Sequence, residues 1–171
     1  RMYTEKSDKK YRPALTKAID FVLQSQYPIG GWPQRYPPSK SQPHKGVADY
    51  ASFITFNDDV ADKNMEFLLM CYQALNKEFI DETRVLDAIN RGMNAYITLQ
   101  LKQPQAGWSM QYDAKFLPEG ARSFEPKSLS TSTTVDNILQ LIKFYRLTGD
   151  RKFLTPIPAA LDWLETTKLP T

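Results

Sequence analysis

"LQSQYPIGGWPQRY" at residues 23–36 returns 76 residues later as "LQLKQPQAGWSMQY" at residues 99–112. Each copy closes a helix-like run and continues into a loop that contains a Gly-Trp pair. A unit that recurs at such a period is typical of helical repeats, because each repeat buries its apolar face only against its neighbours. The matched pairs are Leu23 with Leu99, Gln24 with Gln100, Pro28 with Pro104, Gly31 with Gly107, Trp32 with Trp108 and Tyr36 with Tyr112.

A third, partial copy is found at a shift of 142 residues. In this register the first copy lacks a helix before Arg1, and the third copy stops before its Gly-Trp pair. We therefore expect residues 1–171 to be part of a larger domain, with helices missing on the N-terminal side and the end of a repeat missing on the C-terminal side. The third set pairs Tyr3 with Tyr145, Asp8 with Asp150, Lys10 with Lys152, Ala18 with Ala160, Asp20 with Asp162, Phe21 with Trp163 and Pro28 with Pro170.

Apolar residues recur at helical spacing along most of the chain, and the long Pro/Gly/Ser-rich loops at 27–57 and 103–131 show no convincing strand alternation. The repeat predicts that both loops lie on the same side of the molecule, because equivalent helices end in equivalent places. The fold class is therefore predicted to be all-α, as an α/α toroid or solenoid. The predicted helices are 11–26, 60–76, 83–102, 133–148 and 156–167.

The composition excludes several classes of protein. The net charge is +3, and the 22 Lys and Arg residues are scattered, which gives no footprint for a nucleic acid. No apolar stretch reaches the roughly 18–20 residues of a membrane span. Cys71 is the only cysteine and lies in the apolar run "MEFLLMCYQAL", so we expect it to be buried and not part of a disulfide or a metal site.

The stretch "ITFNDDVADKN" places Asn57, Asp58 and Asp59 at the start of a predicted helix. Carboxylates there are ordinary caps, which satisfy free N–H groups and complement the helix dipole. The alternative is that Asp58 is an oxygen ligand for Ca²⁺. Both interpretations stay open at this point.

Aromatic residues follow each Gly-Trp pair. Trp32 and Trp108 are expected to fill core space between helices, each with its indole N–H on a loop carbonyl. Tyr36 and Tyr112 are expected to be exposed, where a flat ring beside a cleft suits a sugar.

The loop "EGARSFEPKSLSTSTT" crowds Arg122, Glu125 and Lys127 ahead of a Ser/Thr cluster that can cap the next helix. It is either a solvated loop or an anion pocket, in which Arg122 grips a carboxylate with two parallel hydrogen bonds and Lys127 adds a point charge. His44 is the only histidine and lies in an exposed-looking loop, which leaves Ser-His-Asp and Cys-His schemes little support.

Together, "YPIGGWPQRYP", "ITFNDD", "GWSMQYD", "ARSFEPKSLS" and "RLTGDRKFLTPIPAALDWLE" resemble polysaccharide lyase family 10, the pectate lyases with an incomplete (α/α)₃ toroid. The resemblance runs along nearly the whole chain. The loop 38–53 departs from the family's usual short link, and Thr133 stands where many relatives have Glu. The family's Asp-Asn motif, which helps hold Ca²⁺ and substrate, would fall before Arg1.

The resemblance implies Ca²⁺-dependent β-elimination on polygalacturonate, with Arg122 as the base. An arginine can act as a base only where its pKa is lowered, and failing that Arg122 fits a carboxylate clamp. Asp58 is the expected Ca²⁺ ligand, and export from the cell is implied by the substrate. The expected substrate contacts are Asp113, Tyr36, Tyr112, Lys127 and Asn57. Asp113 can instead be a turn residue. A further expected partner is the rest of the protein's own domain.

Other functions remain open. Gln26, Gly30 and Trp32 match the Q-x-x-x-G-x-W repeat of triterpene cyclases, although "FNDD" alone does not supply the acid-rich segment of such an enzyme. The same match can be a structural device that ties helix ends together. A non-catalytic module that binds pectin or uronate is the stronger rival. A glycoside hydrolase needs a matched pair of carboxylates, for which Asp58 with Asp113 or Glu125 is conceivable.

Overall fold

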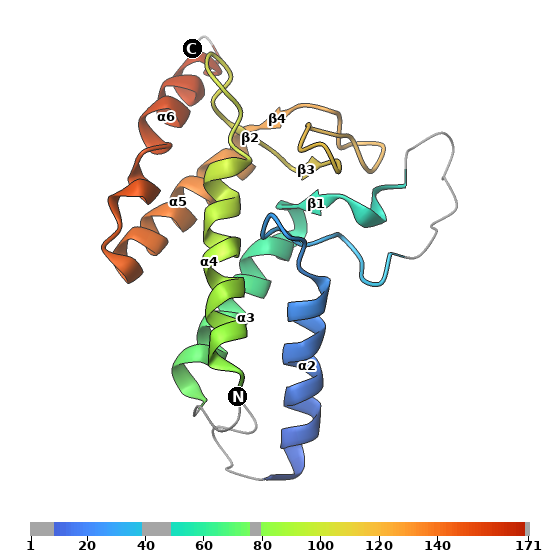
Figure 1. The fold of residues 1–171 in the computed structure, drawn as a ribbon. Helices are drawn as coiled ribbons and strands as arrows, with labels where there is room; N and C mark the ends of the chain where they lie inside the picture. The colour runs from blue at the N-terminus through green and yellow to red at the C-terminus, as the bar shows by residue number, and fades with distance from the viewer. Residues whose placement is uncertain (1–8, 39–48, 76–79, 170–171) are drawn as a thin grey trace.

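The computed structural model describes residues 9–38, 49–75 and 80–169. His44, most of the loop 38–53, and the repeat positions Tyr3, Asp8 and Pro170 lie outside these residues. The described part is mostly helical, which confirms the all-α class (Figure 1). None of its helices has the length and apolar character that a membrane crossing requires.

The predicted helices all form, with ends that differ by a few residues. Capping follows the expected chemistry: the side chain of Ser130 accepts the N–H of Thr133 at 3.2 Å at one helix start, and Asp81 accepts that of Arg84 at 3.1 Å at another. The α-helices are α2 (Arg12–Ser25), α3 (Val60–Ala74), α4 (Glu82–Thr98), α5 (Thr131–Thr148) and α6 (Ile157–Thr166), and the 3₁₀ turns are η1 (Lys9–Tyr11), η2 (Tyr50–Ser52), η3 (Asn57–Asp59) and η4 (Arg151–Leu154).

Helix α4 was predicted to continue to residue 102, but it ends at Thr98. The reason is a competing hydrogen bond, because the N–H of Leu101 donates to the carbonyl of Gly107 at 3.1 Å and not to a carbonyl of its own helix. The loop after α4 therefore closes on itself before another helical turn can form.

The expectation of no strands is wrong for the loops. Four two-residue strands form there, too short for alternation to show in the sequence: β1 (Ile54–Thr55) pairs with β3 (Gln111–Tyr112), and β2 (Trp108–Ser109) pairs with β4 (Leu129–Ser130), both antiparallel. The pairing of β1 with β3 joins loop 27–57 to loop 103–131. The prediction that these loops share one side is thus confirmed.

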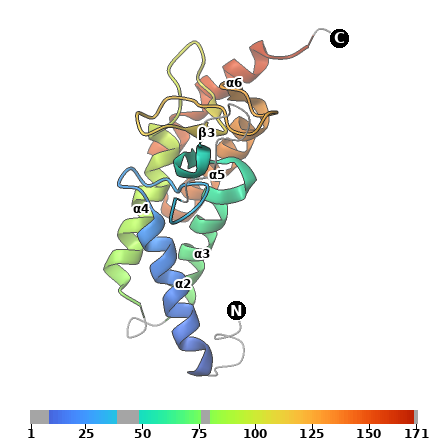
Figure 2. The ribbon, with the colours of Figure 1, turned by 90° about the vertical axis from the view of Figure 1, so that its right-hand side faces the viewer.

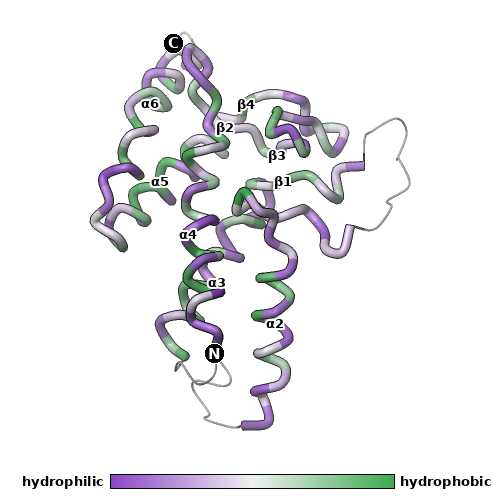
Figure 3. Tube along the Cα trace, in the orientation of Figure 1, coloured by the Kyte–Doolittle hydropathy of each residue, from purple (hydrophilic) through white to green (hydrophobic). Residues whose placement is uncertain are grey.

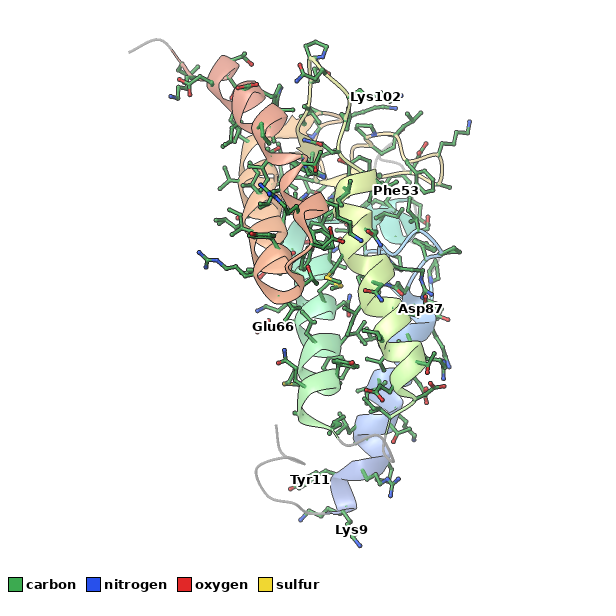
Figure 4. All side chains as sticks on the ribbon, turned by 60° about the vertical axis from the view of Figure 1, so that its left-hand side comes forward. Lys9, Tyr11, Phe53, Glu66, Asp87 and Lys102 are labelled. Carbon is green, nitrogen blue, oxygen red and sulfur yellow. The ribbon has the colours of Figure 1, made fainter. Side chains whose placement is uncertain are left out.

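The views agree on this arrangement. In Figure 2 the segments around β3 lie across one end of α2, α3 and α4. Figure 4 shows Lys9 and Tyr11 at one end of the bundle, and Phe53 and Lys102 toward the other. The long loops therefore form a layer on the end of the helices where the Gly-Trp pairs lie.

The core is apolar between the helices and aromatic beneath the loop layer. Hydrophobic and hydrophilic segments alternate along the helices in Figure 3, as amphipathic helices require. Rings pack edge to face from Tyr96 to Phe144 and from Phe144 to Phe153, with centroids 5.1 and 5.7 Å apart. Cys71 is buried here, as expected, and burial raises the pKa of its thiol to about 11.

Both tryptophans fill the core as predicted, but the acceptor of each indole N–H is a helix carbonyl and not the loop carbonyl that was expected. The indole N–H of Trp32 donates to the carbonyl of Val22 at 3.0 Å, and that of Trp108 donates to the carbonyl of Tyr96 at 2.8 Å. The two copies of the repeat thus use the same contact to hold the end of the preceding helix.

A glutamine in each copy, buried in the first and partly buried in the second, ties one helix end to a later part of the chain. Nε2 of Gln26, just after α2, donates to the carbonyls of Gly30 and, at 2.8 Å, Ala88 in α4. Nε2 of Gln100, just after α4, donates to the carbonyls of Ala106 and, at 2.9 Å, Pro156 before α6. The repeat had aligned Gln24 with Gln100, but Gln26 makes the equivalent contacts. The structural interpretation of the Gln-Gly-Trp match is therefore confirmed.

Candidate functional site

The turn Asn57–Asp59 connects β1 to α3 in an unusual backbone conformation. Asp58 and Asp59 are both left-handed, with φ of 54° and 57°. Aspartate tolerates this region better than most residues, because its short side chain can bond locally. Asp59 stands at the N-cap of α3 but makes no side-chain cap, and Asp58 makes none either. The capping interpretation is thus wrong for both carboxylates.

The carboxylate of Asp58 instead faces the loop that follows β3. Nη2 of Arg122 donates to Oδ1 of Asp58 at 3.0 Å, and Nε2 of Gln34 donates to Oδ2 at 3.1 Å. Arg122 also pairs with Glu125. The side chains of Arg122 and Asp58 are 34% and 40% exposed, whereas that of Glu125 is 2% exposed. A half-exposed cation is thus held between one exposed and one buried carboxylate.

Charge pairing fixes the protonation state of this cluster. The hydrogen bonds that Arg122 donates to Glu125 and Asp58 raise the pKa of its guanidinium above its already high ordinary value. The same contact with Arg122 lowers the pKa of Glu125, against the opposing effect of burial. In the described state Arg122 is therefore a cation and Glu125 an anion.

A small polar cavity of about 70 Å³ adjoins the turn. Asp58, Asp59, Asp62 and Asp136 line it, and burial together with the neighbouring charges of Asp62 and Asp59 raises the pKa of Asp136. Asn137, also in the wall, is buried, and its Nδ2 has no hydrogen-bond partner among the described residues. Within the described ranges, no group of three or more His, Cys, Asp or Glu residues is arranged to hold a metal ion.

A longer groove of about 690 Å³ continues from this cavity between α3 and α5. Asp59 and Asp62 line both depressions. Farther along the groove, its wall carries Lys63 and Lys143 beside apolar residues of the two helices. The two depressions therefore meet at Asp59 and Asp62.

The two tyrosines of the repeat differ in exposure. Tyr36 is 38% exposed, as expected, and its ring packs against Phe21. The expectation that Tyr112 is exposed is wrong, since it is fully buried. Its hydroxyl accepts the N–H of Ser109 at 2.7 Å, and its ring packs edge to face on Phe56. The pairing of β3 with β1 covers this ring, so it has no face left for a sugar.

Two further predicted contacts have partners within their own loop. The carboxylate of Asp113 accepts the N–H groups of Lys115 at 2.8 Å and Leu117 at 2.9 Å, which is the turn role left open above. Lys127 pairs with Glu119 at 2.6 Å and is more than half exposed. Asn57, in contrast, joins the Arg122 cluster through its hydrogen bond to Glu125. The structure thus brings Asn57, Asp58 and Arg122 together, whereas the carboxylate of Asp113 stabilises the turn of its own loop.

Glu125 and Gln34 are members of the cluster that the sequence did not single out for this role. Glu125 was considered only as part of a charged loop or as a hydrolase carboxylate. Gln34 precedes Tyr36 in the first Gly-Trp loop, and its side chain reaches Asp58 across 24 residues of sequence. Neither contact has a local sequence signal, because both depend on how the two loops are brought together.

Comparisons with known proteins agree on one family. The profile of the pectic acid lyases matches residues 1–171. The solved structure of a mutant family 10 polysaccharide lyase from Cellvibrio cellulosa, in complex with trigalacturonic acid, has a TM-score of 0.75 and 26% identity, and the match covers 94% of this chain and 50% of that chain.

A second structure of a family 10 polysaccharide lyase from Cellvibrio cellulosa has a TM-score of 0.66 and 29% identity, over 82% of this chain and 44% of that one. The chain thus spans about half the length of these relatives. A search of curated protein sequences returned no significant match.

Proposed function

The chain belongs to the pectic acid lyase family, and we propose that it cleaves polygalacturonate by Ca²⁺-dependent β-elimination at the Asp58–Arg122 site. The observation that carries the proposal is the ion pair between these two residues, which the fold brings together from loops far apart in sequence. The bound trigalacturonic acid of the Cellvibrio relative supports an anionic uronate as the substrate class.

The proposed reaction breaks the C5–H bond and the C4–O4 bond of a galacturonate unit. A base removes the C5 proton, the electron pair forms a C4=C5 double bond, and the leaving O4 is protonated. The C5 proton is weakly acidic until the adjacent carboxylate is neutralised, so cationic groups must lie next to that carboxylate. In this proposal Ca²⁺ would supply that neutralisation, and Arg122 would add to it only if it acts as a clamp.

The residues fit a cation site that is shared with the substrate. Asp58 supplies one partly exposed carboxylate. Among the described residues, no group of three or more His, Cys, Asp or Glu side chains is arranged to hold a metal ion. Because Ca²⁺ takes six to eight oxygen ligands, the remaining ones must come from uronate carboxylates, main-chain carbonyls, water or other parts of the protein. Bound there, the ion supplies neutralisation of the substrate carboxylate.

We assign the proton abstraction to Arg122. The ion pairs keep it protonated in the free protein, so the assignment requires that its pKa falls in the substrate complex, as the positive charge of a nearby Ca²⁺ would make it do. Asp58 is the more exposed partner and the proposed metal ligand, and is therefore the one expected to move away. If Arg122 stays protonated throughout, it acts as a clamp on the uronate carboxylate instead.

The contacts speak against a glycoside hydrolase. A general acid needs a carboxyl group with a raised pKa, whereas pairing with Arg122 lowers the pKa of Glu125. Asp113, the other conceivable partner, is occupied by the turn. The glutamine ties of the two repeats support an α/α toroid as the proposed fold type.

The proposal is tested by incubating the full-length protein with polygalacturonate and Ca²⁺. Ultraviolet absorbance from conjugated unsaturated ends is the expected result, because only elimination forms the double bond. New reducing ends without that absorbance would contradict the lyase and favour a hydrolase. Binding without either product would favour the non-catalytic module.

A further inference from the structure

We propose that Glu125 is a positioning residue that holds the Arg122 guanidinium at the site and ties it to the Asn57–Asp59 turn. The inference rests on the proposed role of Arg122 and adds a residue to it. Glu125 itself is not a candidate for touching substrate, because its side chain is 2% exposed.

The contacts of Glu125 join both loops of the site. Its Oε2 accepts the main-chain N–H of Arg122 at 3.0 Å, while its Oε1 accepts Nη2 of Arg122 and Nδ2 of Asn57. A buried carboxylate is costly unless it is paired and hydrogen-bonded, and here donors reach both oxygens. The same carboxylate therefore fixes Arg122 and the turn that carries Asp58.

The backbone around Glu125 adds to this restraint. Its N–H donates to the carbonyl of Arg122 at 2.8 Å, and its carbonyl accepts the N–H of Ala121 at 3.1 Å. The tight turn thus fixes the backbone position of Arg122, while the Glu125 carboxylate fixes the position of its guanidinium. Gly120 packs against this turn so closely that an added Cβ would lie 3.1 Å from the Glu125 carbonyl oxygen.

The two carboxylates that pair with Arg122 therefore have different roles. Glu125 is buried and holds Arg122 through both main chain and side chain, whereas Asp58 is 40% exposed and holds only the guanidinium. A substrate carboxylate or a cation can displace Asp58 without disturbing Glu125. Arg122 then stays in place while its exposed side changes partners.

The test compares Glu125→Gln and Glu125→Asp with Glu165→Gln, which removes an exposed carboxylate on α6 that pairs only with Lys168 in the described residues. Glutamine keeps the size but loses the charge, and aspartate keeps the charge but is too short to reach. We expect both Glu125 variants to lower kcat about 10–100-fold with KM changed less than about threefold, since misplacing a reacting group affects the chemical step most. Glu165→Gln should leave both constants unchanged.

A second readout follows the guanidinium directly. In the nuclear magnetic resonance spectrum of the wild type, rotation about the Cζ–Nη bonds of Arg122 should be slow, and Glu125→Gln should make it fast. Fast rotation in the wild type overturns the proposal even if the variants do not fold, as does an unchanged kcat in Glu125→Gln. If the wild type forms no unsaturated product, the proposed function fails, and the rotation rates alone decide whether Glu125 positions Arg122.

Discussion

Nη2 of Arg122 lies 3.0 Å from Oδ1 of Asp58, although 64 residues of chain separate them. Both side chains are more than a third exposed, and ion pairs in that environment contribute only about 0–1 kcal/mol to stability. The pair is thus inexpensive to open, and either member can turn to a ligand. This exchangeability is what the proposed reaction requires of the site.

Replacement of Arg122 separates a base from a clamp. If it is the base, Arg122→Ala and Arg122→Lys should each lower kcat by about 100-fold or more while oligogalacturonate still binds. If Arg122 is a clamp that acts equally on ground and transition states, both substitutions should raise KM and leave kcat nearly unchanged. Lysine keeps the charge but loses the planar fork that binds a carboxylate through two hydrogen bonds. Steady-state kinetics gives both constants. Nearly full kcat/KM in either variant would rule out the assignment.

The variant Asp58→Asn tests the proposed metal ligand. Asparagine tolerates the left-handed backbone of this position as aspartate does, so the substitution removes the charge without backbone strain. We expect Ca²⁺-dependent binding of trigalacturonate, measured by calorimetry, to weaken at least about tenfold. Asp162→Asn, at an exposed position on α6, is the matched control and should bind normally. A loss of stability with unchanged binding would assign Asp58 a structural role only.

The pairing of Glu125 predicts how stability depends on pH. Because Arg122 lowers the pKa of Glu125 in the folded state from 4.5, the unfolded chain takes up a proton first as the solution becomes acidic. The contribution of the pair is present above pH about 4.5 and is lost as the pH falls through the lowered value. Urea unfolding between pH 7 and pH 3 should show the wild type's advantage over Glu125→Gln shrinking in acid. An advantage that grows in acid would contradict the prediction.

Gly30 and Gly149 form a matched pair for testing the close approach of the first loop to α4. Both have positive φ, 105° and 71°, but a Cβ on Gly30 would lie 2.0 Å from the carbonyl oxygen of Arg91, whereas one on Gly149 meets nothing within 4 Å. Gly149→Ala should cost about 1–2 kcal/mol of unfolding free energy from backbone strain alone. Gly30→Ala should cost more than about 4 kcal/mol, measured by urea unfolding. Equal costs would mean that α4 yields to the added methyl group.

The features that the sequence predicted well are those with a repeated or periodic signal. The Gly-Trp pairs at a constant spacing identified Trp32 and Trp108 as equivalent core residues, and helical spacing located the helices to within a few residues. The same repeat correctly placed the two long loops on one side. Each of these features depends on short-range pattern or on self-similarity, both of which can be read directly from the chain.

The features that escaped prediction depend on contacts between the loops. Tyr36 and Tyr112 occupy matching positions of the repeat, yet only Tyr112 is covered, because β3 pairs with β1 above the aromatic core. Glu125 resembles any charged residue in a solvated loop, but its side chain is buried and accepts a hydrogen bond from Asn57, which is 68 residues away in sequence. The strands were missed because two residues cannot establish an alternation.

Gln26 and Gln100 have a consequence for how the molecule opens. Each side chain reaches past the next helix along the chain, so α2 is tied to α4, and α4 to the segment that begins α6. If α4 frays near Ala88, the buried side-chain amide of Gln26 loses a hydrogen-bond partner, at a cost on the order of 1–3 kcal/mol. Native-state hydrogen exchange should accordingly group the amides of α2 and α4 into a single cooperative unit rather than show them opening one helix at a time.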